Sequence, residues 1–365
     1  MIENPVIFLI FHIRYIDKRE DIFSVKMTTR EKIPMEPNNL LKILIIALSL
    51  LFVLNCPVFA DSTETNLSPD LKSDDLSILP SGNLPVVYLE GSPYQMGYSY
   101  GIQAAPSIAA ARDNTWAIAL LKHDRKFVLD KLALIADSVR NNITDFSYDE
   151  FIRGITEGAQ TQGYSVTPTD IYLINSMFSL ESPPGSPPTG CTNSAVWGDR
   201  TDSGEPIVSS NYDYHRSLIN GYTNLIVAYP DGKHAFVSTG VPGRLSNSFQ
   251  MNDAGVARTV SKGPSSRKED SAFQVTDFFL GPYVVMSASD ADTAKDIILS
   301  MPLSGGSIHL VADKKGKAYV IETTAALKAV RTPGENGEDD YLISTNFFLN
   351  ETMKPAQKPW DPKLY

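Results

Sequence analysis

Apolar residues recur with helical spacing over the stretch that follows residue 84. The pattern predicts four helices, at about residues 94–123, 126–139, 148–162 and from 168 to 178. In the third of them Phe151, Ile155 and Ala159 share one face. Thr167 and Pro168 form a capping sequence for the fourth. This segment of the chain is therefore expected to be mainly helical.

The pattern changes after a Pro- and Gly-rich run at residues 182–190. This run can continue neither a helix nor a central strand, because its prolines lack a donor and fix φ. Short apolar runs then predict strands at about residues 195–197, 207–212, 225–229, 235–238, 249–252 and 256–260. Helices follow at about 273–287 and 290–301, and strands at 307–312, 318–322 and 341–345. Strands, two helices and strands again indicate an α+β layered domain.

Within the first predicted helix, Gly97 and Gly101 form a Gly-x-x-x-Gly pair. In a soluble helix this spacing indicates close packing against a neighbouring helix more often than membrane dimerisation. We therefore expect a tight helix contact at this place.

An apolar run at residues 43–54 follows Lys42 and ends in the small-residue site at residues 58–60. The run is shorter than the roughly 20 residues that span a bilayer, and its flanks are those of a signal peptide. We expect export to the periplasm, the cell surface or the medium, and no stable membrane span after the signal is removed. If the signal is not cleaved, it would anchor the protein in the membrane.

The sequence predicts this domain organisation: an N-terminal extension and signal peptide at 1–60, a flexible leader at 61–83, a helical segment at 84–190, and a catalytic segment at 191–365. The extension is long for a signal peptide, so Met27 or Met35 is an alternative start.

A formal net charge of -10 argues against nucleic acid as a partner, because phosphate binding needs a clustered basic face. The histidines, among them His123, His234 and His309, show no metal-ligand spacing. We therefore expect neither a metal nor another cofactor.

Cys191 is the only cysteine left once the signal peptide is removed, because the other is Cys56. It stands where the Pro/Gly loop meets a strand, whereas buried structural cysteines usually lie within an element. Gly190 before it leaves its own carbonyl open to attack by the thiol. If the bond between them breaks, Cys191 gains an α-amine that can act as its general base. Self-cleavage between Gly190 and Cys191 is therefore predicted.

Hairpin geometry gives a second expectation for the same region. A turn centred on Asp202 would place Asp213 opposite Cys191, with Asn211 on the same face. A carboxylate and an amide would then flank the terminal amine, although a slip of one residue would undo this. The alternative is a strand end with solvated polar groups.

Several motifs resemble those of the isopenicillin N acyltransferase family of N-terminal-nucleophile hydrolases. They cover most of the chain from Leu84 to Leu349, and are Gly-Cys-Thr-Asn-Ser-Ala at 190–195, Asn-Tyr-Asp-Tyr at 211–214, the Gly91–Gly101 segment, Met-Asn-Asp-Ala-Gly at 251–255, and Thr345-Asn346. The resemblance implies a four-layer αββα sandwich and autocatalytic maturation into two subunits that stay together as a heterodimer.

The resemblance also implies roles for particular residues. Cys191 would be the nucleophile, Asp213 would orient its amine, and Asn346 would supply an oxyanion donor. Asn211, His215 and Asn252 are candidates for substrate binding, although His215 could equally be a surface residue of a hairpin.

Two departures from the family pattern limit how far the residue roles of the family can be assigned to this chain. Bile salt hydrolases have an arginine where this chain has Ser210, and relatives continue beyond Thr-Asn to a late arginine that this chain lacks before Tyr365. The sequence is therefore expected to be a truncated form of a longer protein.

The functional prediction is hydrolysis of a linear amide bond in a small acylated molecule. Transfer of the acyl group to an amine is an alternative. A third possibility, from another class, is an exported ligand-binding protein in which Cys191 is inert or pairs with another molecule.

Overall fold

The structure is a computed structural model that describes residues 8–12, 25–28, 85–180, 190–213, 224–265 and 267–357. These residues belong to one compact unit made of residues 1–28 and 84–365. The expected signal peptide, the leader, the loop at 181–189 and His215 lie outside the described residues.

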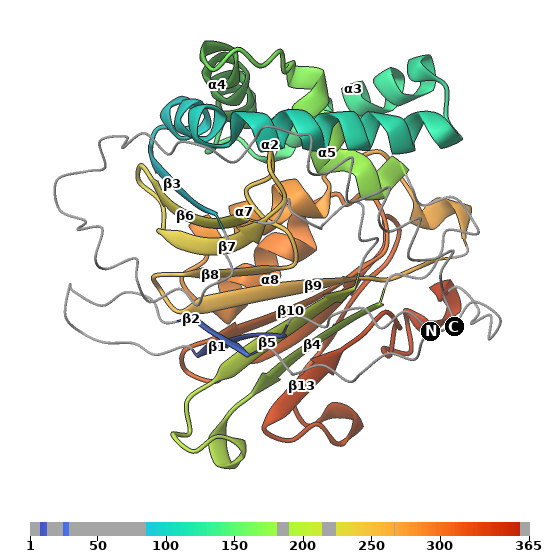
Figure 1. Cartoon of the computed structure of the whole chain (residues 1–365). Helices are drawn as coiled ribbons and strands as arrows, with labels where there is room; N and C mark the ends of the chain where they lie inside the picture. The colour runs from blue at the N-terminus through green and yellow to red at the C-terminus, as the bar shows by residue number, and fades with distance from the viewer. Residues whose placement is uncertain are drawn as a thin grey trace, which may run out of the picture. The chain divides into compact units, whose positions relative to one another are not determined.

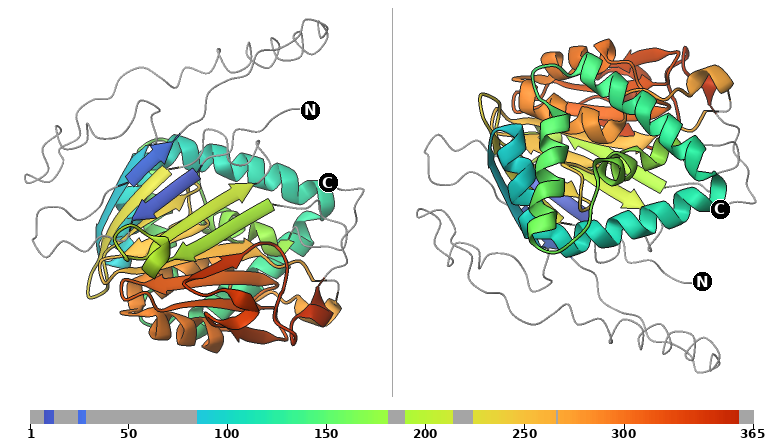
Figure 2. Two further views of the ribbon diagram at one scale, coloured as in Figure 1. Left: turned by 90° about the horizontal axis from the view of Figure 1, so that it is seen from below. Right: turned by 90° about the horizontal axis from the view of Figure 1, so that it is seen from above.

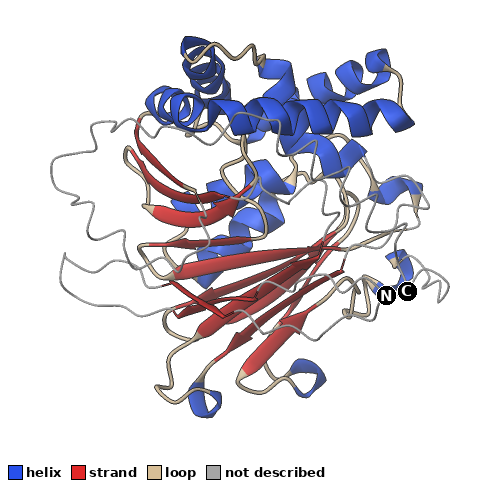
Figure 3. Cartoon of the chain, viewed as in Figure 1, coloured by secondary structure: helices blue, strands red, loops and turns tan. Residues whose placement is uncertain are grey.

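The described chain contains α-helices in two groups, one before and one after the Pro/Gly loop (Figures 1 and 3). Their bounds are α2 Pro93–Lys122, α3 Arg125–Asn142, α4 Tyr148–Thr161, α5 Pro168–Leu180, α7 Asp277–Ser287 and α8 Ala291–Ser300. Short 3-10 helices lie at η2 Gly198–Arg200, η3 Lys268–Asp270, η4 Glu335–Gly337 and η5 Lys354–Ala356.

The strands form two sheets. A five-stranded sheet has the order β13-β4-β5-β1-β2, with β1 Phe8–His12, β2 Val25–Thr28, β4 Gly190–Val196, β5 Ile207–Asp213 and β13 Tyr341–Ser344. An eight-stranded sheet has the order β12-β11-β10-β9-β8-β7-β6-β3, with β3 Val86–Gly91, β6 Asn224–Pro230, β7 Phe236–Gly240, β8 Phe249–Asn252, β9 Val256–Lys262, β10 Ser307–Asp313, β11 Ala318–Thr323 and β12 Lys328–Arg331. All named pairs are antiparallel except β3 with β6.

The two sheets pack face to face. Buried residues of the five-stranded sheet, such as Ala195 and Val208, share one apolar cluster with Leu310 and Val320 of the eight-stranded sheet. Helices α7 and α8 cover the other face of the eight-stranded sheet (Figure 1). The α+β class with an N-terminal helical segment is thus confirmed. Among the described residues no α-helix covers the outer face of the five-stranded sheet, so they supply three of the four expected layers (Figure 2).

Helices α2 and α4 cross at a contact built from glycines. A Cβ added at Gly97 would clash with the Phe151 carbonyl, and one at Gly158 would clash with the Tyr98 carbonyl. Helix backbones can approach this closely only where side chains are absent. The expected close packing of the Gly-x-x-x-Gly pair is confirmed.

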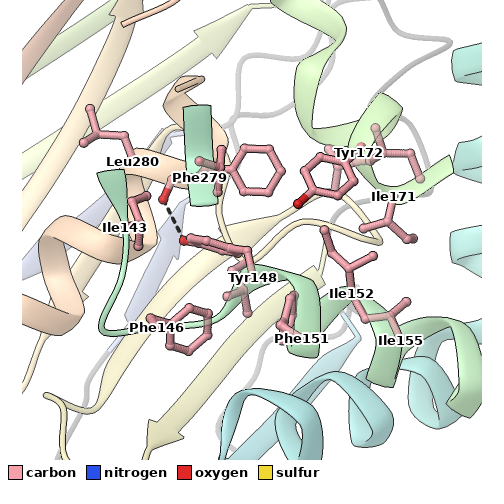
Figure 4. Packing of buried hydrophobic residues seen from close by; sticks show 14 of the residues in the cluster. Ile143, Phe146, Tyr148, Phe151, Ile152, Ile155, Ile171, Tyr172, Phe279 and Leu280 are labelled. Atoms are coloured by element: carbon pink, nitrogen blue, oxygen red, sulfur yellow. Dashed lines mark hydrogen bonds between the residues drawn. The ribbon is translucent and has the colours of Figure 1, made fainter. Parts of the chain in front are cut away.

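A second apolar cluster joins the helical segment to α7. Figure 4 shows the rings of Phe146, Tyr148, Tyr172 and Phe279 packed around this contact. The Tyr148 hydroxyl donates to the Phe279 carbonyl at 2.6 Å, so its one polar group is satisfied in an apolar setting. The segment before the Pro/Gly loop therefore shares a hydrophobic core with α7 and with the helix-covered face of the eight-stranded sheet.

Most of the predicted elements are present within a few residues of their expected ends. The stripe of Phe151, Ile155 and Ala159 is buried as predicted. The helix expected from residue 273 begins at Asp277, because Thr276 before it has extended backbone angles. The strands β1, β2, β3 and β12 were not predicted from the sequence.

Candidate active site

Cys191 is the second residue of β4 and lies between the two sheets. Its side chain is buried, with an exposed fraction of 5%, and it forms no disulfide with any described residue. The alternation along the strand buries Cys191, Asn193 and Ala195 and exposes Thr192. The thiol therefore belongs to the inner face of the five-stranded sheet, at the end of β4 that follows the Pro/Gly loop.

Asn346 lies directly beside Cys191. Strand β13 pairs with β4 so that Ser344 is opposite Asn193, and continuing this register places Asn346 opposite Cys191. The backbone N–H of Cys191 donates to Asn346 Oδ1 at 2.7 Å, and Asn346 Nδ2 donates to the Lys262 carbonyl at 2.7 Å. Two residues that are 155 positions apart in sequence are thus joined at the nitrogen that cleavage would release as an amine.

The expected register of the β4–β5 hairpin is wrong by one residue. Cys191 pairs with Tyr212, while Asp213 pairs with Gly190 and Asn211 pairs with Thr192. The loop from Trp197 to Pro206 contains an even number of residues, so its centre falls between two residues and not on Asp202. Asn211 consequently shares the face of Thr192, and the prediction that it flanks the Cys191 amine is wrong.

Asp213 is placed here by its backbone pairing alone, as the last residue of β5. Its pairing with Gly190 brings it next to the bond that is predicted to break. The orienting role of Asp213 stays a prediction that follows from the resemblance.

Asn252 does not belong to the Cys191 site. Its Nδ2 donates to the Val285 and Ala288 carbonyls at 2.6 and 2.7 Å, and its Oδ1 accepts from the Val256 N–H at 2.8 Å. The side chain is 2% exposed and lies at the β8–β9 turn, whereas Asn346 contacts the other end of β9. The substrate-binding prediction for Asn252 is wrong, because its amide is used to tie the turn to the end of α7.

The hydrogen-bonded polar side chains around Asn193, next to Cys191, were not predicted from the sequence. Asn193 is fully buried, and its Nδ2 donates to Ser261 Oγ at 2.5 Å and to Ser344 Oγ at 3.3 Å. Its Oδ1 accepts from Ser210 Oγ at 2.7 Å. This one amide therefore joins β4, β5, β9 and β13 beneath the cysteine. The two-residue spacing from Cys191 was the available signal, because it places both side chains on one face.

A buried ion pair fixes the chain that follows Asn346. Glu322 accepts the Leu349 and Asn350 N–H groups at 2.9 and 3.1 Å, and it also accepts Arg331 Nε at 3.0 Å. Arg331 Nη2 donates to the Ile343 carbonyl at 2.7 Å, just before Asn346. The Glu322–Arg331 pair thus holds both sides of the Asn346 segment in place.

The buried side chains of Arg258 and His309 lie with the partly exposed Asp277 on the helix side of β9. Arg258 contacts His309 Nδ1 at 2.8 Å and Asp277 Oδ1 at 3.5 Å. Burial lowers the pKa of Arg258 to about 10, and burial followed by the Arg258 charge holds the pKa of His309 well below 6.5. Burial also raises the pKa of Asp277, although Arg258 and Lys262 oppose this. His309 is therefore neutral in the folded chain.

The described residues contain no cluster suited to a metal ion. No group of three or more His, Cys, Asp or Glu side chains among them could hold one.

No helix in the described ranges is long and apolar enough to cross a membrane.

The arrangement at Cys191 allows one particular chemistry. A buried thiol follows Gly190 at the start of a strand, and its own backbone nitrogen is held by a side-chain amide. These features, on two stacked sheets, suit a hydrolase that uses Cys191 as its nucleophile.

The comparison with protein families agrees with this class. Residues 200–360 match the family model described as acyl-coenzyme A:6-aminopenicillanic acid acyl-transferase. The matched range contains Asp213, Asn252 and Asn346, and Cys191 precedes it. The resemblance inferred from the motifs is confirmed over this range.

Individual proteins show more distant similarity. A protein of Archaeoglobus fulgidus is 24% identical over 265 residues, which is 67% of this chain and 44% of that protein, so the chain spans less than half of that relative. An N-acylethanolamine-hydrolyzing acid amidase ortholog of Caenorhabditis elegans has a TM-score of 0.36 at 16% identity, covering 43% of this chain and 70% of its own. Penicillin V acylase from Agrobacterium tumefaciens has a TM-score of 0.22 at 12% identity, covering 39% and 41% of the two chains. A conjugated bile acid hydrolase variant from Clostridium perfringens gives 0.21 at 12% identity, covering 42% and 44%.

Proposed function

We propose that the protein is a self-processing cysteine hydrolase that cleaves a linear amide bond in a small acylated molecule. The observation that carries the proposal is the 2.7 Å hydrogen bond from the Cys191 N–H to Asn346 Oδ1. That nitrogen is an amide in the intact chain and would be the catalytic amine after cleavage. The family match over residues 200–360 supports the same chemistry.

Maturation would begin with attack of the Cys191 thiol on the Gly190 carbonyl. Gly190 carries no side chain to obstruct this attack. The peptide bond would be exchanged for a thioester, and water would then release the helical segment from the new N-terminus. The two fragments would remain together, because helices α2–α5 share an apolar cluster with α7 and the eight-stranded sheet.

Turnover would use the new amine as a general base. An amine that donates one N–H to Asn346 Oδ1 keeps its lone pair available for the thiol proton. The thiolate would attack the substrate amide, the amine would protonate the leaving group, and water would resolve the acyl thioester. Asn346 has a second Nδ2–H besides the one given to Lys262, and this could donate to the oxyanion.

Acyl transfer to an amine is the second candidate, because the matched family model is described as an acyl-transferase. Export through a signal peptide belongs to the same proposal, and it favours water as the acceptor because exported proteins meet little acyl-coenzyme A.

A series of N-acyl p-nitroanilides tests the proposed activity. The processed wild type should release p-nitroaniline and Cys191→Ala should release none, while the Cys191 peptide should carry the acyl mass. Asn346→Asp keeps the shape but cannot donate to the Lys262 carbonyl or to an oxyanion, so kcat should fall about 100-fold. Equal turnover by wild type and Cys191→Ala would contradict the proposal. With hydroxylamine added as the acceptor amine, the yield of hydroxamate would measure the share of acyl transfer.

A further inference from the structure

A second nucleophile and base lie together on the surface, away from Cys191. His234 Nδ1 is 2.7 Å from Asp253 Oδ1, and His234 Nε2 is 3.3 Å from Ser289 Oγ. The side chains of His234 and Asp253 are 31% and 42% exposed, and Ser289 is exposed. These are the contacts that define a Ser-His-Asp triad, in which a serine is activated by a histidine that a carboxylate orients.

Backbone contacts hold the three residues in place. They come from three separate connections, namely the β6–β7 turn, the β8–β9 turn and the link between α7 and α8. The His234 N–H donates to the Met286 carbonyl at 3.0 Å, and the Asp253 N–H donates to the Ala235 carbonyl at 2.9 Å. Asn252 donates to the Ala288 carbonyl, which directly precedes Ser289. The triad is thus supported by a framework that does not depend on its own side-chain bonds.

The position of this group separates it from the Cys191 site. Asp253 lies at the turn that starts β9, and Lys262, whose carbonyl binds Asn346, ends the same strand. At about 3.3 Å per residue the two ends of β9 are roughly 20 Å apart. A reaction at Ser289 would therefore be independent of the thiol.

The hydrogen bonds assign the proton positions that an active triad needs. Asp253 offers only acceptors when it is ionised, so His234 Nδ1 carries the hydrogen of their contact. In the neutral ring Nε2 is then an acceptor, and Ser289 Oγ donates to it. We propose that Ser289, His234 and Asp253 form a second hydrolytic site that cleaves small, unhindered esters.

The surroundings of Ser289 fit this reaction. Ser289 immediately precedes Asp290, the N-cap of α8, and no described residue accepts a hydrogen bond from the Asp290 N–H. This N–H, at the positive end of a helix, is the donor for the developing oxyanion. His234, Asp253 and Ser289 are all accessible to solvent, so a small substrate can reach Ser289 directly. The substrate class is therefore a small activated ester and not a long acyl amide.

The reaction would proceed through an acyl-serine. Ser289 Oγ forms a bond to the ester carbonyl carbon while its proton passes to His234 Nε2. The tetrahedral intermediate then expels the alcohol, which takes the proton from His234 and leaves an acyl-serine. Water attacks this ester with His234 again as the base, and the acid and the free serine are released.

Hydrolysis of p-nitrophenyl acetate by full-length Cys191→Ala protein tests the proposal, because this parent lacks the thiol. Adding Ser289→Ala should lower the rate at least tenfold, and adding His234→Asn should do the same. Adding Ser203→Ala, at an exposed serine in the β4–β5 loop, should leave the rate of the parent unchanged. Diisopropyl fluorophosphate should label the parent at Ser289 and at no other serine.

Two results would overturn the second site. One is a Ser289→Ala rate equal to that of the parent, with no label on Ser289. The other is loss of hydrolysis in His234→Asn but not in Ser289→Ala, which would mean that the imidazole alone attacks the ester. Neither result depends on whether the amide hydrolase proposal holds, because Cys191 is absent from every protein in the series.

Discussion

Asn346 connects the residues of the candidate site through a single amide. Its oxygen accepts from Cys191 and its nitrogen donates to Lys262, so the two ends of the side chain are distinguished by their partners. The fully buried Asn193 has a similar role beneath the cysteine, where it contacts three serines. Because buried amides are costly when they are not satisfied, both side chains restrict the geometry around the cysteine.

His309 gives a prediction for the dependence of stability on pH. Burial and Arg258 hold its pKa well below 6.5 in the folded chain, so the unfolded chain takes up a proton first as the pH falls. The free energy of unfolding should therefore decrease below about pH 6.5, by up to about 1.4 kcal/mol per pH unit for this group. The raised pKa of Asp277 acts in the opposite direction, in a window that starts near its ordinary value of 3.8.

Urea denaturation of wild type and His309→Gln between about pH 7 and about pH 5 measures this effect. The variant should lose stability less steeply than wild type as the pH falls. Equal slopes for wild type and His309→Gln would contradict the assignment of a buried neutral histidine.

Elements were easier to predict from this sequence than the pairing between them. Periodicity and capping residues such as Thr167 located the helices, because those signals are local. The β4–β5 register was missed by one residue, because it depends on how many residues the loop from Trp197 to Pro206 holds outside the ladder. Such a slip changes which side chains share a face, so Asn211 was assigned to the wrong side.

The candidate site was only partly predictable for the same reason. Cys191 could be identified as a candidate nucleophile because its position after a Pro/Gly loop is unusual. Asn346 could be identified only from the family motif. Asn252 was misplaced, because a motif shared with a family does not say which end of a strand its residues occupy. The short strand β12 was missed because Lys328–Arg331 has only two adjacent apolar residues between two charged ones, so it shows neither the alternation nor the length of an apolar run that predicts a strand.

The contact between α2 and α4 depends on the absence of a side chain at Gly97. Gly97→Ala would place a methyl group against the Phe151 carbonyl, and backbone atoms cannot move aside as the end of a flexible side chain can. The free energy of unfolding should fall by about 1–3 kcal/mol. Gly305→Ala is the matched control, since its Cβ would meet nothing within 4 Å. Chemical denaturation of both variants checks this, and an unchanged midpoint for Gly97→Ala would show that the helices are not in close contact.

For the molecule as a whole, the fold explains how a chain could be cut in its middle and stay assembled. Helices α2–α5 precede Gly190, whereas α7 and strands β6–β12 of the eight-stranded sheet follow it, yet both segments contribute to one apolar cluster. Tyr148 on α4 also donates to the Phe279 carbonyl on α7. Cleavage at Cys191 would remove a single covalent link while leaving this packing intact.

The mass of the purified protein, for wild type and Cys191→Ala under denaturing and reducing conditions, tests self-processing most directly. We predict two wild-type fragments that meet at Gly190 and Cys191, and one uncleaved chain for Cys191→Ala. Cys191→Ser should mature slowly or stall, because an alcohol is a weaker nucleophile than a thiol. A wild-type chain that stays intact, or a Cys191→Ala chain cut at the same bond, would contradict the claim that Cys191 cleaves its own chain.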